Sequence, residues 1–498
     1  VLATNPTGDK VVDMIVDERV IREAELPAFE RVIKEAGSGS VMCSYNKVNG
    51  VQACENEFLL KTVLRDNWGF AGFVASDYGA ARSSKTINAG MEMENSLIPA
   101  RFLGVNMLPL LASGEVSTER LDEMVRRIVQ PMFKGGLFEH PPSMQPAAYA
   151  SIVSGPASIA MARRMASEGT VLLKNASKIL PLQAQGKKIA VLGSGAINPG
   201  LPAPGPLSIF GLGPVVNRPY TGGGSSSVLT TAAVYPCDGM TSAAARYGAT
   251  VTCNGTSNPE TAAALARSSD IAIVFAWLQA SEGADLPSLD HSDSPLIDAV
   301  SKANPNTVVV LISGNPVLMP WLNNVPAVLQ GWIAGQEFGN AYADVLFGDV
   351  EPGGRLPVSF LKESKDSWIQ SAEQFPGVNF QAKYSEGLFW GYRWFDQQKI
   401  EPLFAFGHGL SYTTWDYSEL EVTPTTKGAK VSFTVHNTGA RAGLDVAQIY
   451  VGFPPAAEEP PRQLKGFQKV RLASGGSQRV TVQLDARAFQ IWSNAKKD

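Results

Sequence analysis

The stretch Gly69–Ala80, Gly-Phe-Ala-Gly-Phe-Val-Ala-Ser-Asp-Tyr-Gly-Ala, constrains the fold of this 498-residue chain more than any other. Its apolar run Phe73–Ala75 is bounded by turn residues, which predicts a buried strand of a parallel sheet. Asp77 follows this strand, and α/β barrels carry their functional groups at the C-terminal ends of their strands. The alternative is that Asp77 caps a helix that follows.

The region around this stretch alternates predicted helices with predicted strands. Residues 11–37 are expected to be helical, with Asp17 capping a first turn and Pro27 opening a second helix. Further strands are expected at Ser40–Ser44 and Ile87–Met93, and further helices at Glu57–Asp66 and Thr118–Phe133. This rhythm is typical of parallel βα units.

Two regions with other patterns follow. A segment rich in Pro, Ala and Ser predicts a linker, after which a second α/β domain of the sandwich type is expected. Its expected strands are Ile189–Leu192, Ile271–Trp277, Thr307–Ile312 and Val328–Trp332. From about Trp415, apolar and polar residues alternate, which predicts a small β-sandwich. The predicted boundaries are 1–142 for the first domain, 143–156 for the linker, 157–375 for the second domain, 376–414 for a connecting segment and 415–498 for the sandwich.

Composition argues against two classes of protein. The net charge is −4 and no basic cluster is present, so no nucleic-acid partner is expected. The chain contains no run of about 18 apolar residues, so no membrane span is expected.

The cysteines and the glycosylation sequons indicate in which cellular compartment the protein is expected. The four cysteines fall into two pairs that are close in sequence, Cys43 with Cys54 and Cys237 with Cys253. An even count suits disulfides in an oxidising compartment, and four reduced core thiols are the alternative. The sequons at Asn175 and Asn254 are candidate glycosylation sites, so secretion to the extracellular space is expected.

Paired carboxylates are the candidate chemistry that the residues support best. The four histidines are scattered and no Cys-x-x-Cys occurs, so no metal site is expected. Gly193-Ser194-Gly195 follows a predicted strand but lacks the spacing of a dinucleotide loop, and no cofactor is expected. Glu282 lies on a loop beyond the predicted strand Ile271–Trp277 and offers a second carboxylate beside Asp77. Two carboxylates suit glycoside hydrolysis, in which one attacks the sugar and the other transfers a proton.

Ordered motifs along nearly the whole chain resemble glycoside hydrolase family three, the β-glucosidase group. The motifs that carry this resemblance are Ser40–Asn46, Gly69–Tyr78, Val171–Asn175, Gly335–Gly339, Pro352–Pro357, Tyr384–Gly387, Gly391–Arg393, Phe406–Tyr412, Asn437–Gly439 and Leu464–Phe467. The resemblance implies the C-terminal part of a (β/α)8 TIM-like barrel, an α/β sandwich domain and a fibronectin type III-like domain.

The resemblance also implies roles for individual residues. Asp77 corresponds to the family's nucleophile, and Glu282 corresponds to the acid/base of the β-glucosidase branch. Met42 and Tyr45 correspond to residues that line the first sugar subsite. Tyr78 stands where the family usually has a sugar-stacking Trp, and Ser225 belongs to a Gly-x-Gly-Ser motif that faces the sugar.

Several departures from the family's pattern affect these expectations. Leu286 replaces the Arg of the acid/base loop, so Asp285 loses a partner, and Asp290 competes with Glu282 for the role of acid/base. The family's Lys-His motif does not occur in the sequence, so we expect that the chain starts after this motif and lacks roughly the first five βα units of an eight-unit barrel. The C-terminal sandwich is expected to be truncated. We expect either that a second chain supplies the missing barrel half or that the sequence is part of a longer protein.

The expected function is that of a secreted, retaining exo-β-glucosidase acting on β-glucosides or oligosaccharides, as in cellulose degradation. One alternative is a β-xylosidase or another exo-β-glycosidase of the same family. A second alternative is a non-catalytic carbohydrate-binding protein on the same scaffold. A homodimer stays open as an assembly.

Overall fold

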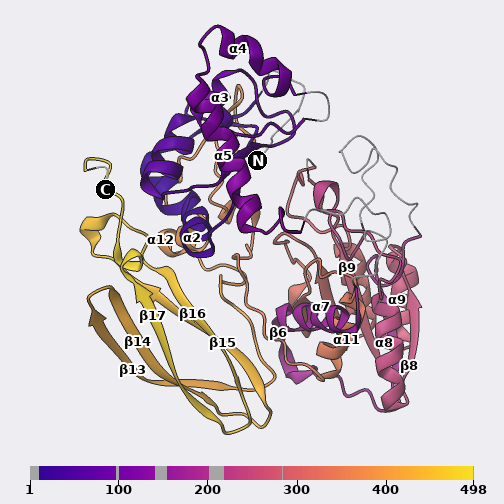
Figure 1. The fold of residues 1–498 in the computed structure, drawn as a ribbon. Coiled ribbons are helices and arrows are strands. Elements are labelled where there is room, and N and C mark those ends of the chain that lie inside the picture. The colour runs from indigo at the N-terminus through magenta and orange to yellow at the C-terminus, as the bar shows by residue number, and fades with distance from the viewer. Residues whose placement is uncertain (1–10, 97–99, 141–153, 201–217, 283, 497–498) are drawn as a thin grey trace. The chain divides into compact units, whose positions relative to one another are not determined.

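The computed structural model describes residues 11–96, 100–140, 154–200, 218–282 and 284–496. Contacts divide the chain into two compact units (Figure 1). The first unit comprises Val1–Ser151, Ile369–Leu388 and Ile491–Asp498, and the second comprises Ile152–Trp368 and Phe389–Gln490. The linker predicted at 143–156 lies mostly outside the described residues.

The first unit contains two small sheets and the helices that pack on them. Strand β2 (Ser40–Cys43) pairs in parallel with β5 (Phe73–Ser76), as expected for neighbouring barrel strands. A second sheet has the order β12-β1-β3-β4. Its strands are β12 (Gln381–Lys383), β1 (Asp13–Ile15), β3 (Lys47–Val48) and β4 (Val51–Gln52). The helical segments of this unit are α1 (Glu18–Val20), Ile21–Glu25, α2 (Pro27–Ala36), Ala53–Glu55, Phe58–Asn67, α3 (Lys85–Ala89), Gly104–Met107, α4 (Leu108–Ala112) and α5 (Thr118–Lys134).

Two predictions for this unit are wrong. Residues 13–15 form strand β1 rather than the start of a helix, because β1 pairs in parallel with β12, whose residues lie far along the chain. Ile87 belongs to helix α3, which Gly90 ends with a φ of 118°. Met93 then forms a single parallel bridge with Ala75 instead of extending a strand. The cap at Asp17 and the helix start at Pro27 are confirmed.

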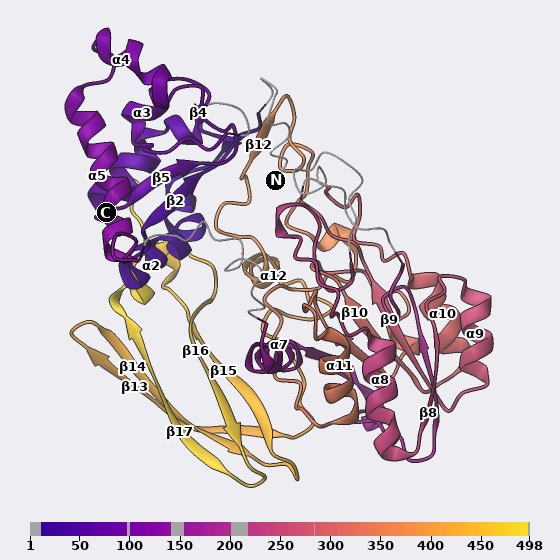
Figure 2. The ribbon, with the colours of Figure 1, turned by 45° about the vertical axis from the view of Figure 1, so that its right-hand side comes forward.

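The second unit is built on a six-stranded sheet with the order β6-β11-β10-β9-β7-β8. Figure 2 labels its strands β8, β9 and β10. Its strands are β6 (Val171–Asn175), β7 (Lys188–Leu192), β8 (Thr250–Asn254), β9 (Ile271–Trp277), β10 (Thr307–Ile312) and β11 (Ala327–Gln330). All residues of β9, β10 and β11 are buried, as continuous apolar runs predict for central parallel strands. Only the pairing of β6 with β11 is antiparallel among these strands.

Helices cover both faces of this sheet. Side chains of α8 (Pro236–Ala244) and α11 (Phe338–Phe347) join the core on one face, and those of α9 (Pro259–Arg267) and α10 (Ser294–Ala303) join the core on the other. Helix α7 (Pro156–Gly169) packs against α11. The arrangement is the α/β sandwich expected from the alternation of apolar runs and helical segments. The further helical segments of this unit are Ala176–Lys178, Gly224–Ser226, Ala245–Tyr247, Leu322–Asn324, Ser364–Asp366, α12 (Tyr392–Gln398), Pro455–Ala457 and Ala486–Phe489.

A β-sandwich follows within the second unit. One sheet has the order β13-β14-β17 and the other pairs β15 with β16. The strands are β13 (Trp415–Thr425), β14 (Gly428–Asn437), β15 (Gly443–Val451), β16 (Gln463–Leu472) and β17 (Ser477–Asp485). Val431, Phe433 and Val435 alternate inward along β14 and meet Val470 and Val480 in one core, which confirms the period-two pattern.

Hydropathy gives no candidate for a membrane span among the helices of the described residues.

Candidate active site

Asp77 lies directly beyond the C-terminal end of β5. The register of β2 and β5 places Cys43 beside Ser76, and the Asp77 N–H donates to the Cys43 carbonyl at 3.0 Å. Asp77 Oδ1 accepts the N–H of Tyr78 at 2.7 Å. The next helix is α3, whose N-cap residue is Ser84, so Asp77 does not cap it. The carboxylate is therefore a half-buried group at the C-terminal end of a paired strand.

Three predicted sugar-binding residues lie near Asp77 within the first unit. Met42 on β2 is paired with Ala75 on β5. Alternate residues of a strand share a face, so Ala75 and Asp77 lie on the same face of the sheet, and Met42 lies on that face too. The Tyr45 hydroxyl donates to the Tyr78 carbonyl at 2.9 Å. Met42 and Tyr78 are 58% and 51% exposed, so both offer apolar surface to a ligand. The structure thus brings Met42, Tyr45, Asp77 and Tyr78 together.

A buried charge cluster supports β5 from its N-terminal half. Glu92 is 1% exposed, and its Oε2 accepts the Val74 N–H at 2.7 Å and contacts Arg65 at 2.9 Å. Its Oε1 contacts Arg120 at 3.0 Å and Arg127 at 3.3 Å. Burial lowers the pKa of the Arg65 guanidinium to about 10, and the Glu92 charge opposes this shift. Glu92 therefore ties the strand that presents Asp77 to three arginines.

Asn95 is a second support that the motifs did not identify. Its side-chain amide donates to the Ser76 carbonyl at 2.8 Å, and its backbone carbonyl accepts the Gly79 N–H at 2.9 Å. These bonds hold the turn on both sides of Asp77. The only sequence signal for this role is the position of Asn95 shortly after Glu92, in a segment without helical or strand periodicity.

Glu282 lies in the second unit on the loop after β9. Its backbone N–H donates to the Gly223 carbonyl at 3.3 Å, and Gly223 donates to the Ala280 carbonyl at 3.0 Å. The Ser225 N–H donates to Glu282 Oε2 at 2.7 Å. Hydrogen bonds from the Ser225 hydroxyl and N–H lower the pKa of the Glu282 carboxyl. Ser225 therefore contacts the predicted acid/base directly, a partnership that the motif alone did not suggest.

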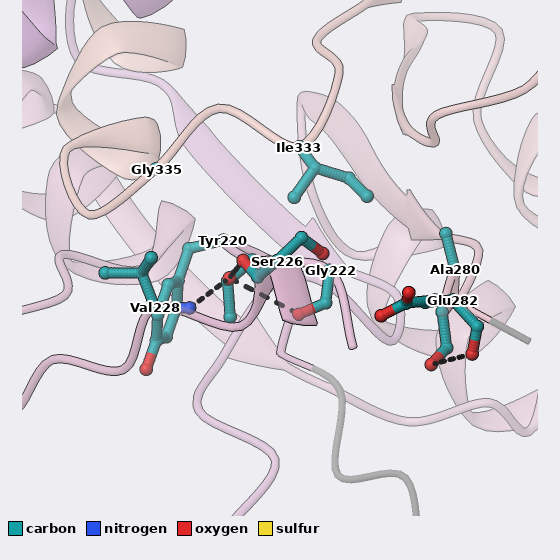
Figure 3. Close-up of a pocket in the computed structure, with 10 residues that line it drawn as sticks. Tyr220, Gly222, Ser226, Val228, Ala280, Glu282, Ile333 and Gly335 are labelled. Atoms are coloured by element: carbon teal, nitrogen blue, oxygen red, sulfur yellow. Dashed lines mark hydrogen bonds between the residues drawn. The ribbon is translucent and has the colours of Figure 1, made fainter. Parts of the chain in front are cut away.

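A cavity of about 560 Å³ lies beside Glu282 (Figure 3). Figure 3 shows Glu282 and Ala280 on one side, Tyr220 and Val228 on the other, and Ile333 between them. The remaining lining residues are Thr221, Gly222, Ser226, Ser281 and Gly335. The walls combine apolar side chains with hydroxyl groups, as sites for small organic ligands do.

Asp290 has a local role in this loop. Its side chain is exposed, and Oδ2 accepts the Ser288 hydroxyl at 3.0 Å. Asp285 and Leu286 lie between Glu282 and this turn, and none of the three residues lines the cavity. The geometry therefore favours Glu282 over Asp290 as the carboxylate that faces a ligand.

The cysteine pairs and sequons have distinct environments. Disulfides join Cys43 to Cys54 in the first unit and Cys237 to Cys253 in the second. The Asn175 amide donates to the Leu180 carbonyl at 2.9 Å and accepts the Leu180 N–H at 3.0 Å. Asn254 ends strand β8 at the edge of the sheet, and its Oδ1 accepts the Thr256 N–H at 3.0 Å.

Family models match most of the chain. Residues 4–130 match the glycosyl hydrolase family 3 N terminal domain, residues 170–412 match the glycosyl hydrolase family 3 C-terminal domain, and residues 445–498 match a fibronectin type III-like domain. These matches confirm the predicted multidomain fold and its β-sandwich.

Similar proteins include β-glucosidases. The chain is 36% identical to a thermostable β-glucosidase B of Acetivibrio thermocellus over 98% of its own length and 63% of that protein's length. It is 36% identical to a probable β-glucosidase L of Aspergillus terreus over 96% of its own length and 70% of that protein's length. An exo-α-(1→6)-L-arabinopyranosidase of Bifidobacterium breve is 34% identical over 100% of this chain and 65% of its own length. The chain thus spans about two thirds of the length of these relatives.

Solved structures agree with this grouping. The β-D-glucoside glucohydrolase of Trichoderma reesei superposes with a TM-score of 0.89 at 31% identity, over 100% of this chain and 74% of that chain. A β-glucosidase of Streptomyces venezuelae in complex with D-glucose superposes with a TM-score of 0.87 at 30% identity, over 98% of this chain and 76% of that chain. The domain matches, the identity and the shared fold together show that the chain belongs to glycosyl hydrolase family 3, which confirms the family expected from the motifs.

Proposed function

We propose that this protein is a retaining exo-β-glucosidase. The observation that carries the proposal is the Asp77 carboxylate, fixed by paired strands at a strand end beside the exposed Met42 and Tyr78. The β-glucosidases among its relatives support glucose as the sugar that is released. Terminal β-glucosyl residues of oligosaccharides or β-glucosides are the proposed substrates.

In the first proposed step, Asp77 attacks the anomeric carbon and Glu282 protonates the glycosidic oxygen. The bond between the anomeric carbon and that oxygen breaks, the leaving group departs as an alcohol, and a covalent glycosyl-enzyme forms on Asp77. In the second step, Glu282 removes a proton from water, whose oxygen attacks the anomeric carbon and releases Asp77. Two inversions give net retention, and they require the two carboxyl groups to lie about 5–5.5 Å apart in the working site.

The environment of Glu282 bears on the working pH. The first step needs its carboxyl protonated, whereas the hydrogen bonds from Ser225 lower its pKa and favour the ionised form. The protonated fraction therefore falls at lower pH than for an ordinary glutamate. We expect maximal activity on the acidic side of neutrality.

The stereochemistry of the first product tests the proposal. With a β-glucoside substrate, proton NMR is expected to show β-glucose first, with the α-anomer growing only by mutarotation. Initial release of the α-anomer would contradict a double displacement. Absence of any turnover, with glucose binding retained, would favour a non-catalytic carbohydrate-binding protein.

A second exo-glycosidase activity is a candidate because one relative is named as an arabinopyranosidase. A panel of nitrophenyl glycosides separates the candidates. We expect the highest kcat/KM with the β-glucoside. A higher value with the β-xyloside or the α-L-arabinopyranoside would replace glucose as the preferred sugar.

Secretion belongs to the same proposal. Both cysteine pairs form disulfides, and such bonds persist in oxidising compartments. Fractionation of the native host is the test, and recovery of the protein only from the cytosol would contradict secretion.

A further inference from the structure

The Gly193-Ser194-Gly195 turn packs tightly against the end of β9. Gly193 has a φ of 98°, and a Cβ there would lie 2.6 Å from the Phe275 carbonyl oxygen. A Cβ on Gly195 would lie 2.8 Å from Ile312 Cδ1, and the Gly195 N–H donates to the Phe275 carbonyl at 3.0 Å. Gly193 is therefore required by its positive φ and by the close approach of the β9 backbone, and the turn packed against β9 in this way fixes where Ser194 lies.

Ser194 links the two ends of the loop that carries Glu282. Its hydroxyl donates to Asp293 Oδ2 at 2.7 Å and accepts the Trp277 N–H at 3.3 Å. Trp277 is the last residue of β9, and Asp293 directly precedes α10. The loop 278–292 therefore begins and ends at residues that share one serine hydroxyl.

The Asp293 carboxylate bonds the Ser194 hydroxyl instead of capping helix α10. It occupies the N-cap position of α10, yet its side chain makes no capping hydrogen bond. The side chain is buried, at 4% exposure, and Ser194 is the partner that satisfies Oδ2. Asp293, although aspartate often caps a helix at this position, therefore links the end of the loop 278–292 to Ser194.

The C-terminal end of the loop is fixed by two further contacts. The Asp293 N–H donates to Nδ1 of the buried His291 at 3.0 Å, and the Leu318 N–H donates to the Leu289 carbonyl at 2.8 Å. Burial lowers the pKa of His291, although the Asp293 charge opposes the shift, and so favours the neutral imidazole whose Nδ1 can accept. Residues 289–293 are thus anchored, and we call the described residues of 279–288, which carry Glu282 near their start, the arch.

We propose that Ser194 and Asp293 are positioning residues for Glu282, holding the base of the arch while Gly223 and Ser225 hold Glu282 itself. The inference rests on the proposed role of Glu282 as the acid/base. A displacement of about 1 Å in a catalytic group can lower the rate on the order of a hundredfold. Neither Ser194 nor Asp293 touches the reacting atoms in this scheme, so both act through the loop.

Hydrogen exchange tests the closing contact without reference to activity. Ser194→Ala and Asp293→Ala are expected to raise amide exchange across residues 279–288 in the full chain by about tenfold, the value of one net hydrogen bond. Asp293→Asn keeps an acceptor oxygen and is expected to restore protection. Ser313→Ala is the matched control, because Ser313 is a buried serine directly after β10 whose hydroxyl donates to the Asn315 carbonyl at 2.9 Å. Unchanged exchange in Ser194→Ala would overturn the proposal.

Leaving-group dependence tests the catalytic consequence. Cellobiose needs protonation of the departing oxygen, whereas 2,4-dinitrophenyl β-glucoside does not. Ser194→Ala is expected to lower kcat/KM about tenfold for cellobiose and less than about twofold for the dinitrophenyl substrate. Equal losses on both substrates would indicate a general structural role and contradict positioning.

Glu282→Gln, measured in parallel, separates this inference from the proposed function. It should show the same selectivity for leaving groups with a larger loss. If Glu282→Gln shows no such selectivity, the role of Glu282 fails and the positioning of an acid/base fails with it, whatever the exchange data show. If Glu282→Gln shows selectivity and Ser194→Ala does not, only the inference about Ser194 fails.

Discussion

Asp77 and Glu282 are held by two different kinds of structure, although both follow a parallel strand. Asp77 comes directly after β5, bonded through its backbone to the neighbouring strand β2 and supported by the buried Glu92 cluster. Glu282 comes five residues after the end of β9, on an exposed loop, and its contacts are with another loop at Gly223 and Ser225. The first carboxylate is positioned by a sheet and the second by hydrogen bonds between loops.

This contrast suits the two proposed tasks. A nucleophile must attack one carbon along one line, so a rigid strand end is an advantage. An acid/base exchanges protons with a leaving group and then with water, so its pKa matters as much as its place. Loop hydrogen bonds set that pKa at Glu282. We therefore expect substitutions around Asp77 to affect turnover and stability, and those around Glu282 to affect proton transfer.

The largest expected effect is that of Asp77→Ala on turnover. Removal of a covalent nucleophile is expected to lower kcat by about 10⁴-fold or more. The fold is expected to persist, because the Asp77 side chain is half-buried and, among the described residues, its Oδ1 accepts a hydrogen bond only from the adjacent Tyr78 N–H. Steady-state kinetics with a circular dichroism spectrum as the control measures both. Full activity in this variant would remove Asp77 from the mechanism.

Added azide sharpens the comparison between the two carboxylates. In Asp77→Ala, azide can replace the nucleophile and attack from the α face, giving the α-glucosyl azide. In Glu282→Ala, azide can attack the covalent intermediate from the β face, giving the β-glucosyl azide. The same anomer from both variants would contradict the assignment of different roles.

The next largest effect is expected at Glu92, in the stability of the first unit. Glu92→Gln leaves three buried or half-buried arginines without their shared carboxylate, which is expected to cost about 3–5 kcal/mol. Native-state hydrogen exchange of the β5 amides gives this free energy. Glu123→Gln is the matched control, because Glu123 also contacts Arg120 and Arg127 but its side chain is 34% exposed. There the expected cost is below about 1 kcal/mol, and equal costs at both positions would contradict a special role for the buried carboxylate.

Local patterns predicted the strand that leads to each carboxylate. The apolar runs of β5 and β9 and the flanking turn residues are complete within a few positions, so these strands can be recognised in the sequence without knowledge of the strands that pair with them. Strand β1 escaped prediction because it is paired by β12, from residues 381–383, and no local period records that partner. The place of Glu282 on a loop after a predicted strand made it a candidate, and the family resemblance then gave it the role of acid/base.

The supports of the site were harder to predict than the carboxylates. Glu92 and Asn95 act on Val74 and Ser76, about twenty positions earlier, through bonds that exist only once the chain is folded. Ser194 lies between two glycines whose spacing does not fit a nucleotide-binding loop. The sequence therefore predicted no role for Ser194. Its contacts with Trp277 and Asp293 join segments about eighty and a hundred positions away. Such roles follow from tertiary contacts, which composition and periodicity do not encode.

The smallest expected effect is a shift in the pH profile on Ser225→Ala. The Ser225 hydroxyl is the largest cause of the lowered pKa of Glu282, so its loss is expected to raise that pKa while the backbone N–H continues to oppose the rise. A higher pKa keeps the acid protonated to higher pH. The basic limb of kcat/KM for cellobiose should therefore move to higher pH, whereas the acidic limb, which does not report on Glu282 in the proposed mechanism, should stay.

Ser226→Ala is the control for this shift, because the Ser226 hydroxyl belongs to the same turn and donates to the Gly223 carbonyl at 3.1 Å rather than to Glu282. Its basic limb is expected to match that of the unmodified chain. A shift of the acidic limb in Ser225→Ala, or equal shifts of the basic limb in the two serine variants, would contradict the separate roles given to Asp77 and Glu282. If the basic limb moves in Ser225→Ala but not in Ser226→Ala, the Ser225 hydroxyl is the group that lowers the pKa of Glu282.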